Sequence, residues 1–165
     1  MLDQFIKNLK DKEITDVLLV GFVDNEDGIY EFCPHLNYMY FELESKYIKL
    51  EQVYQWPLLR FDIVDSIDFE YEVDEDMARA KSSIAEIVLD DTMALGNNIK
   101  EVVFYELDRK QLICAAMELI LANGQIIFID PSYFWGMHVG GEKQKRIWAD
   151  NYSNIDGVVI SKISV

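Results

Sequence analysis

The sequence is poor in the residues that metal, thiol and nucleophilic chemistry usually needs. It has 2 cysteines and 2 histidines among 165 residues. Cys33 and Cys114 lie far apart with no CxxC spacing, so we expect buried free thiols and no redox or metal site. His35 and His138 are also distant, and no spacing pairs either one with a nucleophile. We therefore expect no metal and no cofactor.

Long apolar runs and common catalytic motifs are absent as well. The N-terminus MLDQFIKNLKDKEI has neither the apolar core nor the small-residue cleavage site of a secretion signal, and no run reaches transmembrane length. We expect a cytoplasmic protein that does not enter a membrane. The motifs GxSxG, HExxH, GxxxxGK[ST] and GxGxxG do not occur, which weakens an enzymatic interpretation.

Positive charge is scarce. The chain has 15 Lys and Arg residues against 30 Asp and Glu residues, which gives a net charge of −15. Such a field repels nucleic acids and anionic membranes and speeds encounter with cationic partners. Excess acid also keeps a protein soluble, and that is the simplest explanation of the overall composition. We expect no nucleic-acid partner and, if there is a partner, a basic protein.

Apolar residues are abundant enough for one folded core. Half of the chain is hydrophobic, and a domain of this size buries roughly 70% of the surface of its unfolded chain. No repeat or linker divides the sequence. We predict a single α+β domain over residues 1–165, with a mainly antiparallel sheet of meander and hairpins and two to four flanking helices.

The spacing of apolar residues predicts the elements of this domain. Helices are predicted at residues 2–11, 75–89 and 142–150. Strands are predicted at residues 17–23, 29–33, 38–43, 47–53, 58–64, 67–76, 101–107, 111–121, 125–130 and 158–163. Pro34 and Pro57 are expected between strands, where a missing N–H does least harm.

Two glycine turns stand out. The sequence DNEDG ends at Gly28 and predicts a turn; it has a superficial likeness to a calcium loop, but Val23 stands where the first carboxylate belongs. Asn123-Gly124, between LELILA and QIIFI, predicts a hairpin with a two-residue type I′ turn, because that turn needs positive φ at both central positions.

The segment IDFEYEVDED, residues 67–76, is the most distinctive stretch. In a strand, one of its faces is apolar and the other is a row of carboxylates about 6.5 to 7 Å apart. The apolar members are Ile67, Phe69, Tyr71 and Val73. The acidic members are Asp68, Glu70, Glu72 and Asp74, and Glu75 and Asp76 extend the row. A row of this kind suits a basic partner.

Part of this acidic row has a structural explanation. Asp74 suits the N-cap of the predicted helix, and Glu75 and Asp76 favour the positive end of its dipole. Asp68, Glu70 and Glu72 are left without such an explanation. Moreover, residues 62–76 contain no Lys or Arg to balance their acids. We take residues 68, 70, 72 and 74–76 as candidate partner-binding positions.

The loop SYFWGMHVGG supplies a second candidate. Tyr133, Phe134 and Trp135 either cover the end of the sheet or form an aromatic anchor patch beside the acids, since buried aromatic anchors often dominate an interface. The basic cluster Lys143, Lys145 and Arg146 is expected to be a solvated helix face.

Taken as a whole, the chain resembles the immunity proteins of bacterial toxin systems, including contact-dependent inhibition and other polymorphic toxins. The resemblance lies in size, charge and element pattern, with IDFEYEVDED and IDPSYFWGMHVGG as its local features. It implies a cytosolic, non-enzymatic protein that neutralises one cognate toxin by covering its active site or another essential surface. On charge, that toxin is expected to be basic. A nuclease, whose phosphate-binding groove the acids would occupy, is one such toxin.

Two alternatives remain open at the level of the sequence. One is a small hydrolase that uses carboxylates with His35 or His138, which requires a histidine held against several carboxylates in a cleft. The other is an accessory or scaffold domain that forms homodimers through its apolar strands. The immunity hypothesis itself is compatible with a monomer or a weak homodimer.

Overall fold

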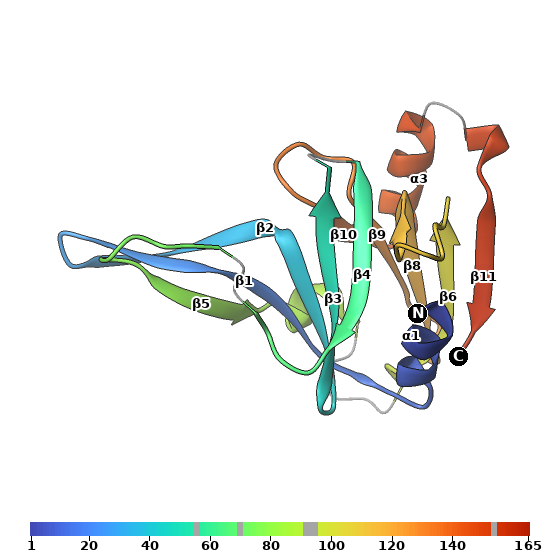
Figure 1. Ribbon diagram of the computed structural model, residues 1–165, viewed down its shortest axis with the longest axis horizontal. Coiled ribbons are helices and arrows are strands. Elements are labelled where there is room, and N and C mark those ends of the chain that lie inside the picture. Colours follow the sequence, from blue (N-terminus) through green and yellow to red (C-terminus); the bar gives the residue numbers. More distant parts are fainter. Residues whose placement is uncertain (55–56, 69–70, 91–95, 153–154) are drawn as a thin grey trace.

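Two antiparallel sheets pack face to face in this protein, and three helices flank them in the part of the chain that is described (Figure 1). The computed structural model describes residues 1–54, 57–68, 71–90, 96–152 and 155–165. This architecture confirms the predicted α+β class and the predominance of antiparallel hairpins. Within the same residues, no helix is both long and apolar enough to cross a membrane.

The first sheet has the strand order β5-β1-β2-β3-β4-β7. Its strands are β1 (Ile14–Glu26), β2 (Ile29–Leu43), β3 (Lys46–Val53), β4 (Leu58–Val64), β5 (Ala78–Ser83) and β7 (Ile113–Cys114). Strands β1 to β4 form the predicted meander. Strand β5 pairs with β1 and forms the edge of this sheet opposite β7.

The second sheet has the order β10-β9-β8-β6-β11. Its strands are β6 (Ile99–Tyr105), β8 (Ala116–Leu121), β9 (Ile126–Asp130), β10 (His138–Gly140) and β11 (Ile160–Ser164). The helices are α1 (Leu2–Leu9), α2 (Ala85–Val88) and α3 (Glu142–Asn151), with a 3-10 turn at Ile155–Gly157. The predicted terminal helices and last strand are therefore present within a few residues of their expected bounds.

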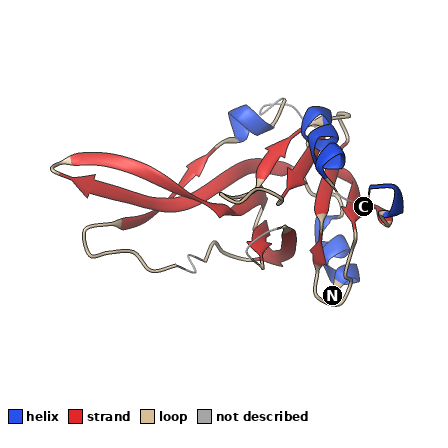
Figure 2. Ribbon diagram, turned by 90° about the horizontal axis from the view of Figure 1, so that it is seen from above, coloured by secondary structure: helices blue, strands red, loops and turns tan. Residues whose placement is uncertain are grey.

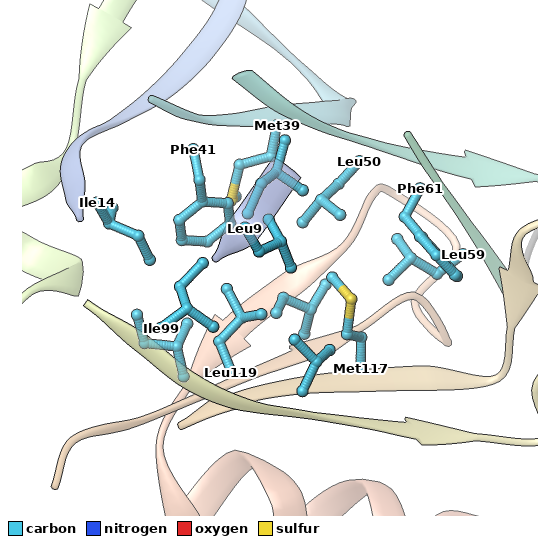
Figure 3. Packing of buried hydrophobic residues seen from close by; sticks show 14 of the residues in the cluster. Leu9, Ile14, Met39, Phe41, Leu50, Leu59, Phe61, Ile99, Met117 and Leu119 are labelled. Carbon is cyan, nitrogen blue, oxygen red and sulfur yellow. The ribbon is translucent and has the colours of Figure 1, made fainter. Parts of the chain in front are cut away.

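The main core lies between the two sheets. Side chains of β2, β3 and β4 meet side chains of β6 and β8 there, as Figure 3 shows for Phe41, Leu50 and Phe61 opposite Ile99 and Leu119. Helix α1 contributes Phe5, whose ring contacts Phe61 at a centroid distance of 4.8 Å. Burying each such side chain stabilises the fold by about 1.5–3 kcal/mol.

Helix α3 covers the outer face of the second sheet. Its Trp148 packs against Tyr105 and Phe128, with ring centroids 5.0 and 5.7 Å away. Beside them, the Nζ of Lys145 lies 2.8 Å from the buried carboxylate of Glu118, which also accepts a hydrogen bond from the Tyr105 hydroxyl at 3.0 Å. Lys145 is therefore not part of a solvated face as predicted; it holds the helix onto the sheet.

Strands β1 and β2 extend well past the sandwich as a long hairpin (Figures 1 and 2). The sequence predicts two strands here, at 29–33 and 38–43, with Pro34 between them. This prediction is wrong, because β2 is continuous and contains Pro34. The extra residues form an irregularity in the register: Leu19 pairs with Met39, whereas Gly21 pairs with Pro34. A side chain at position 21 would collide with the carbonyl of Cys33, so glycine lets the two backbones approach.

The tip of this hairpin, at Asp27-Gly28, has the type I′ turn that the sequence predicts at Asn123-Gly124. Asp27 and Gly28 both have positive φ, of 53° and 79°, as a type I′ turn requires. The hairpin at Asn123-Gly124 is confirmed, but its turn is different. Only Gly124 has positive φ there, and its N–H donates to the carbonyl of Leu121. A three-residue connection with glycine in the left-handed position therefore replaces the type I′ turn.

Two elements of the prediction are wrong between residues 67 and 89. Residues 71–77 and the described part of 65–70 form no strand, and the predicted helix 75–89 is instead β5 followed by the single-turn helix α2. The apolar face assigned to that helix does not exist, since Ile87 is 84% exposed. The open edge of β1 offers residues 78–83 a ladder of hydrogen bonds, and this tertiary pairing outweighs their local helical pattern.

Candidate partner-binding surface

The segment 65–77 is here called the strap, and its described residues, 65–68 and 71–77, cross the outer face of the first sheet. Ile67 and Tyr71 pack on the cluster formed by Leu18, Val20 and Tyr40. This apolar contact places the strap on the side of β1 that faces away from the main core. In Figure 2 the strap runs as a separate trace along one side of the long hairpin.

The described residues of the strap pair with no strand, and side chains provide hydrogen bonds that hold it. The Tyr71 hydroxyl donates to the carbonyl of Gly21 at 2.5 Å, and the Tyr40 hydroxyl donates to the carbonyl of Asp68 at 3.2 Å. The guanidinium of Arg79 donates twice to the carbonyl of Tyr71, at 3.1 and 2.9 Å. Burial raises the pKa of Tyr71, although the charge of Arg79 opposes this. The phenol therefore stays a donor at neutral pH.

The strap keeps the two-sided character that its sequence indicates. Its apolar members Ile67, Tyr71 and Val73 are half-buried, whereas its described acids are exposed. Those acids are Asp65, Asp68, Glu72, Asp74, Glu75 and Asp76. Phe69 and Glu70 lie outside the described residues. Asp74 does not cap a helix; its carbonyl accepts the N–H of Met77 in a turn that leads into β5.

The far end of the hairpin carries further acids. Asp24, Glu26, Asp27 and Glu31 line a shallow hollow of about 280 Å³ together with Ile29. Cross-strand pairing puts Asp24 opposite Glu31 and Glu26 opposite Ile29, so these four side chains share one face of the hairpin.

The strap's turn reaches the level of these hairpin acids. Strand β5 begins at Ala78, which pairs with Val23. The preceding turn at residues 74–77 therefore lies level with residues 24–26, and Figure 1 shows the two segments side by side. Phe22 pairs with Arg79, which holds the strap, so the strap lies on the face that carries Asp24 and Glu31. We call the hairpin residues 21–34 and the strap together the acidic arm.

The acidic arm has no base of its own. Neither 21–34 nor 65–77 contains a Lys or Arg. The bases that flank it include Arg79 and Lys81 on β5, and Lys46, whose Nζ lies 3.6 Å from Asp65. Lys49 and Arg60 line a hollow together with Asp68 of the strap. Large apolar side chains interrupt the acids at the tip, where Ile29 is 72% and Tyr30 73% exposed. Charged and large apolar side chains therefore lie exposed together at the tip of the arm.

The aromatic loop, residues 131–137, is firmly anchored. The buried Asp130 carboxylate accepts hydrogen bonds from the N–H and hydroxyl of Ser132 and from Gln144, at 2.6 to 2.8 Å. The amide of Gln52 donates to the carbonyls of Pro131 and Tyr133, both at 2.6 Å. The Tyr133 ring stacks on His138 with centroids 3.4 Å apart. The backbone of the loop is thus fixed from both sheets.

The three aromatic residues of this loop differ in exposure. Tyr133 is half-buried and helps to fix the loop, through its carbonyl and its stacked ring. Phe134 and Trp135 are 63% and 83% exposed, and their rings meet edge to face at 4.6 Å.

The aromatic loop and the strap meet the same irregular part of β2. His35 stacks on Tyr71 of the strap with ring centroids 5.0 Å apart. The next residue, Leu36, accepts the N–H of Met137 at 3.0 Å and leaves no room for a side chain at Gly136. The loop therefore lies at the edge of β2 next to the point where pairing with β3 begins, and the strap contacts the adjacent residue of the same strand.

Both histidines considered for catalysis pack against aromatic rings. His35 packs between Tyr38 and Tyr71, and His138 packs on Tyr133. Among the described residues, no group of three His, Cys, Asp or Glu side chains could hold a metal ion. Cys114 is buried, and this burial raises the pKa of its thiol far above the usual range.

Sequence reasoning missed the hairpin acids as part of the surface. DNEDG was interpreted only as a turn and a rejected calcium loop. The signal that could have found them is the Asp-Gly turn with acids on both sides. In a hairpin with that turn, Asp24 and Glu26 on one strand and Glu31 on the other lie on the same face.

Comparisons with protein families, with curated proteins and with solved structures give no match to this chain.

Proposed function

We propose that this protein binds a basic protein through its acidic arm and thereby neutralises it, as an immunity protein neutralises a cognate toxin. The observation that carries the proposal is the convergence of two base-free acidic segments, far apart in sequence, on one projecting element. A projecting arm can enter a groove that a flat surface cannot. A groove that binds phosphates is lined with Lys and Arg, which suits a toxin that acts on nucleic acid.

The arm would supply both the rate and the lifetime of such a complex. Its carboxylates would steer the basic partner and raise the association rate at low salt. The exposed Ile29 and Tyr30 would supply the desolvated contacts that slow dissociation. The aromatic pair Phe134 and Trp135 would then contact a second part of the partner at the base of the arm.

The proposal also covers the oligomeric state, the excluded partners and the place of action. A net charge of −15 opposes close approach of two copies, so the protein acts as a monomer or a weak homodimer. The same charge opposes nucleic-acid and membrane partners. Its place of action is the cytoplasm, where an immunity protein meets a toxin that has entered or is made there.

Capture from a lysate of the source organism, with three matched baits, tests the proposal. The first bait is the wild type, and the second carries Glu26→Gln, Glu31→Gln, Asp74→Asn and Asp76→Asn in the acidic arm. The third bait has the same change in net charge at exposed acids elsewhere, through Asp3→Asn, Glu86→Gln, Asp150→Asn and Asp156→Asn.

We expect the wild type and the third bait to retain one basic protein at low salt and to lose it as salt rises. The arm variant should retain little. The retained protein, purified, should lose its toxic activity on addition of the wild type. Equal retention by the two variants would show that the acidic arm is not the binding site.

A further inference from the structure

The outer edge of β2 in the acidic arm is open. Strand β3 pairs with β2 from Tyr38 to Leu43, so within the described part of the chain residues 29–34 have a strand neighbour, β1, on one side only. Among the described residues, the first backbone hydrogen bond on the other side is the one that Leu36 accepts from Met137. The strand Ile29–Pro34 thus presents an unpaired edge to solvent.

The turn determines which backbone groups point out of this edge. In a two-residue hairpin the pair that flanks the turn, Glu26 and Ile29, is hydrogen-bonded, and the pattern then alternates. Tyr30 and Phe32 therefore fall in non-hydrogen-bonded pairs with β1, and their N–H and C=O groups point outward. Pro34 is the next such position, where its missing N–H costs β1 nothing.

One face of this edge is apolar, unlike the edge of a fully protected strand. Natural edge strands are commonly blunted by charge or by being short. The opposite edge, β5, follows that rule with Arg79 and Lys81. The β2 edge instead carries Tyr30, 73% exposed, and the half-buried Phe32 on one face. Glu31, with Asp24 beside it, lies on the other face.

We propose that this edge of β2 accepts a β-strand from the basic partner, so that the arm and the partner form one continuous sheet. The inference rests on the proposed function, because it assigns how the partner is held. The fitting strand alternates apolar residues, which would lie beside Tyr30 and Phe32, with Lys or Arg, which would lie beside Glu31 and Asp24. A second copy of this chain does not fit, because pairing two such edges would bring Glu31 and Asp24 of both copies together.

The probe for this edge is an acetylated, amidated octapeptide in which lysine alternates with valine. We expect the amides of Tyr30 and Phe32 to exchange more slowly with solvent when the peptide is added to ¹⁵N-labelled protein. The amides of Glu31 and Cys33, which already face β1, should not change. The same peptide N-methylated at every valine should not bind, because a valine that faces Tyr30 or Phe32 must donate its N–H.

A pair of variants separates backbone pairing from side-chain contact. Tyr30→Pro and Tyr30→Thr both remove the phenol ring, but only the proline removes the outward N–H, and neither touches the β1 ladder. Tyr30→Pro should bind the peptide about tenfold more weakly than Tyr30→Thr. The amide spectrum of each variant reports whether the arm is still folded.

Three results would overturn strand addition. The N-methylated peptide could bind as well as the parent, the Tyr30 and Phe32 amides could exchange at an unchanged rate, or they could be protected already in a self-associated form seen by sedimentation. If any of these occurs while the lysate baits still separate as expected, the charge-based binding stands and only the strand pairing fails.

Discussion

Neutralising one acid of the arm should stabilise the protein. Asp24 and Glu31 lie directly opposite each other on β1 and β2, in a hydrogen-bonded pair whose Cα atoms are about 5.5 Å apart. Two unit charges at roughly that distance repel by about 0.8 kcal/mol in water, and like charges opposite each other in a sheet cost about 0.2–1 kcal/mol. We therefore expect Glu31→Gln to raise the free energy of unfolding by about 0.5 kcal/mol at low salt.

Urea unfolding at two salt concentrations measures this gain. Because Glu31 is exposed and Asp24 is half-buried, salt should screen part of the repulsion and reduce the gain. A double-mutant cycle with Asp24→Asn isolates the pairwise part, and Glu86→Gln on α2 is the control for a change in net charge. Loss of stability in Glu31→Gln, or an equal gain in Glu86→Gln, would refute the claim that the arm concentrates repulsion.

Three further predictions concern Tyr71, Trp135 and Tyr105. Tyr71→Phe removes the hydrogen bond that fixes the strap, and should lower the free energy of unfolding by about 1 kcal/mol and speed proteolysis within residues 65–77. Trp135→Ala should change the melting temperature little, because the ring is mostly exposed, yet should weaken partner capture. Unchanged capture would mean that the aromatic pair does not contact the partner. Burial, and then Glu118, raise the pKa of Tyr105 to about 12, so stability should be intact below pH 10 and fall between pH 10 and 12. That part of the fall should be absent in Tyr105→Phe, as unfolding across this pH range will show.

The elements that the sequence predicts well are those whose local pattern agrees with their tertiary surroundings. The amphipathic spacing of Leu2, Phe5 and Leu9 predicts α1, and its apolar face is the one that is buried. Apolar residues alternate along β3 and β4, which pair with each other. The hairpin of β8 and β9 turns at Gly124, as the sequence predicts. In each case a short-range signal and the core require the same conformation.

The failures occur where a distant partner decides the conformation. Residues 78–83 pair with β1 although they show no alternation of their own. The strap alternates like a strand but has no strand edge beside it, so Tyr40 and Arg79 satisfy its carbonyls instead. Nothing local in the sequence indicates that residues 74–76 and 24–31 converge, because that proximity depends on the pairing of β5 with β1.

The association rate constant of the captured partner tests the central claim most directly. It should be measured for the wild type, the acidic-arm variant and the charge-matched control described above, at low and at raised salt. We predict that the arm variant associates at least about tenfold more slowly at low salt, that the control matches the wild type, and that raised salt removes the difference. Equal rates for the arm variant and the wild type at low salt would contradict binding through the acidic arm.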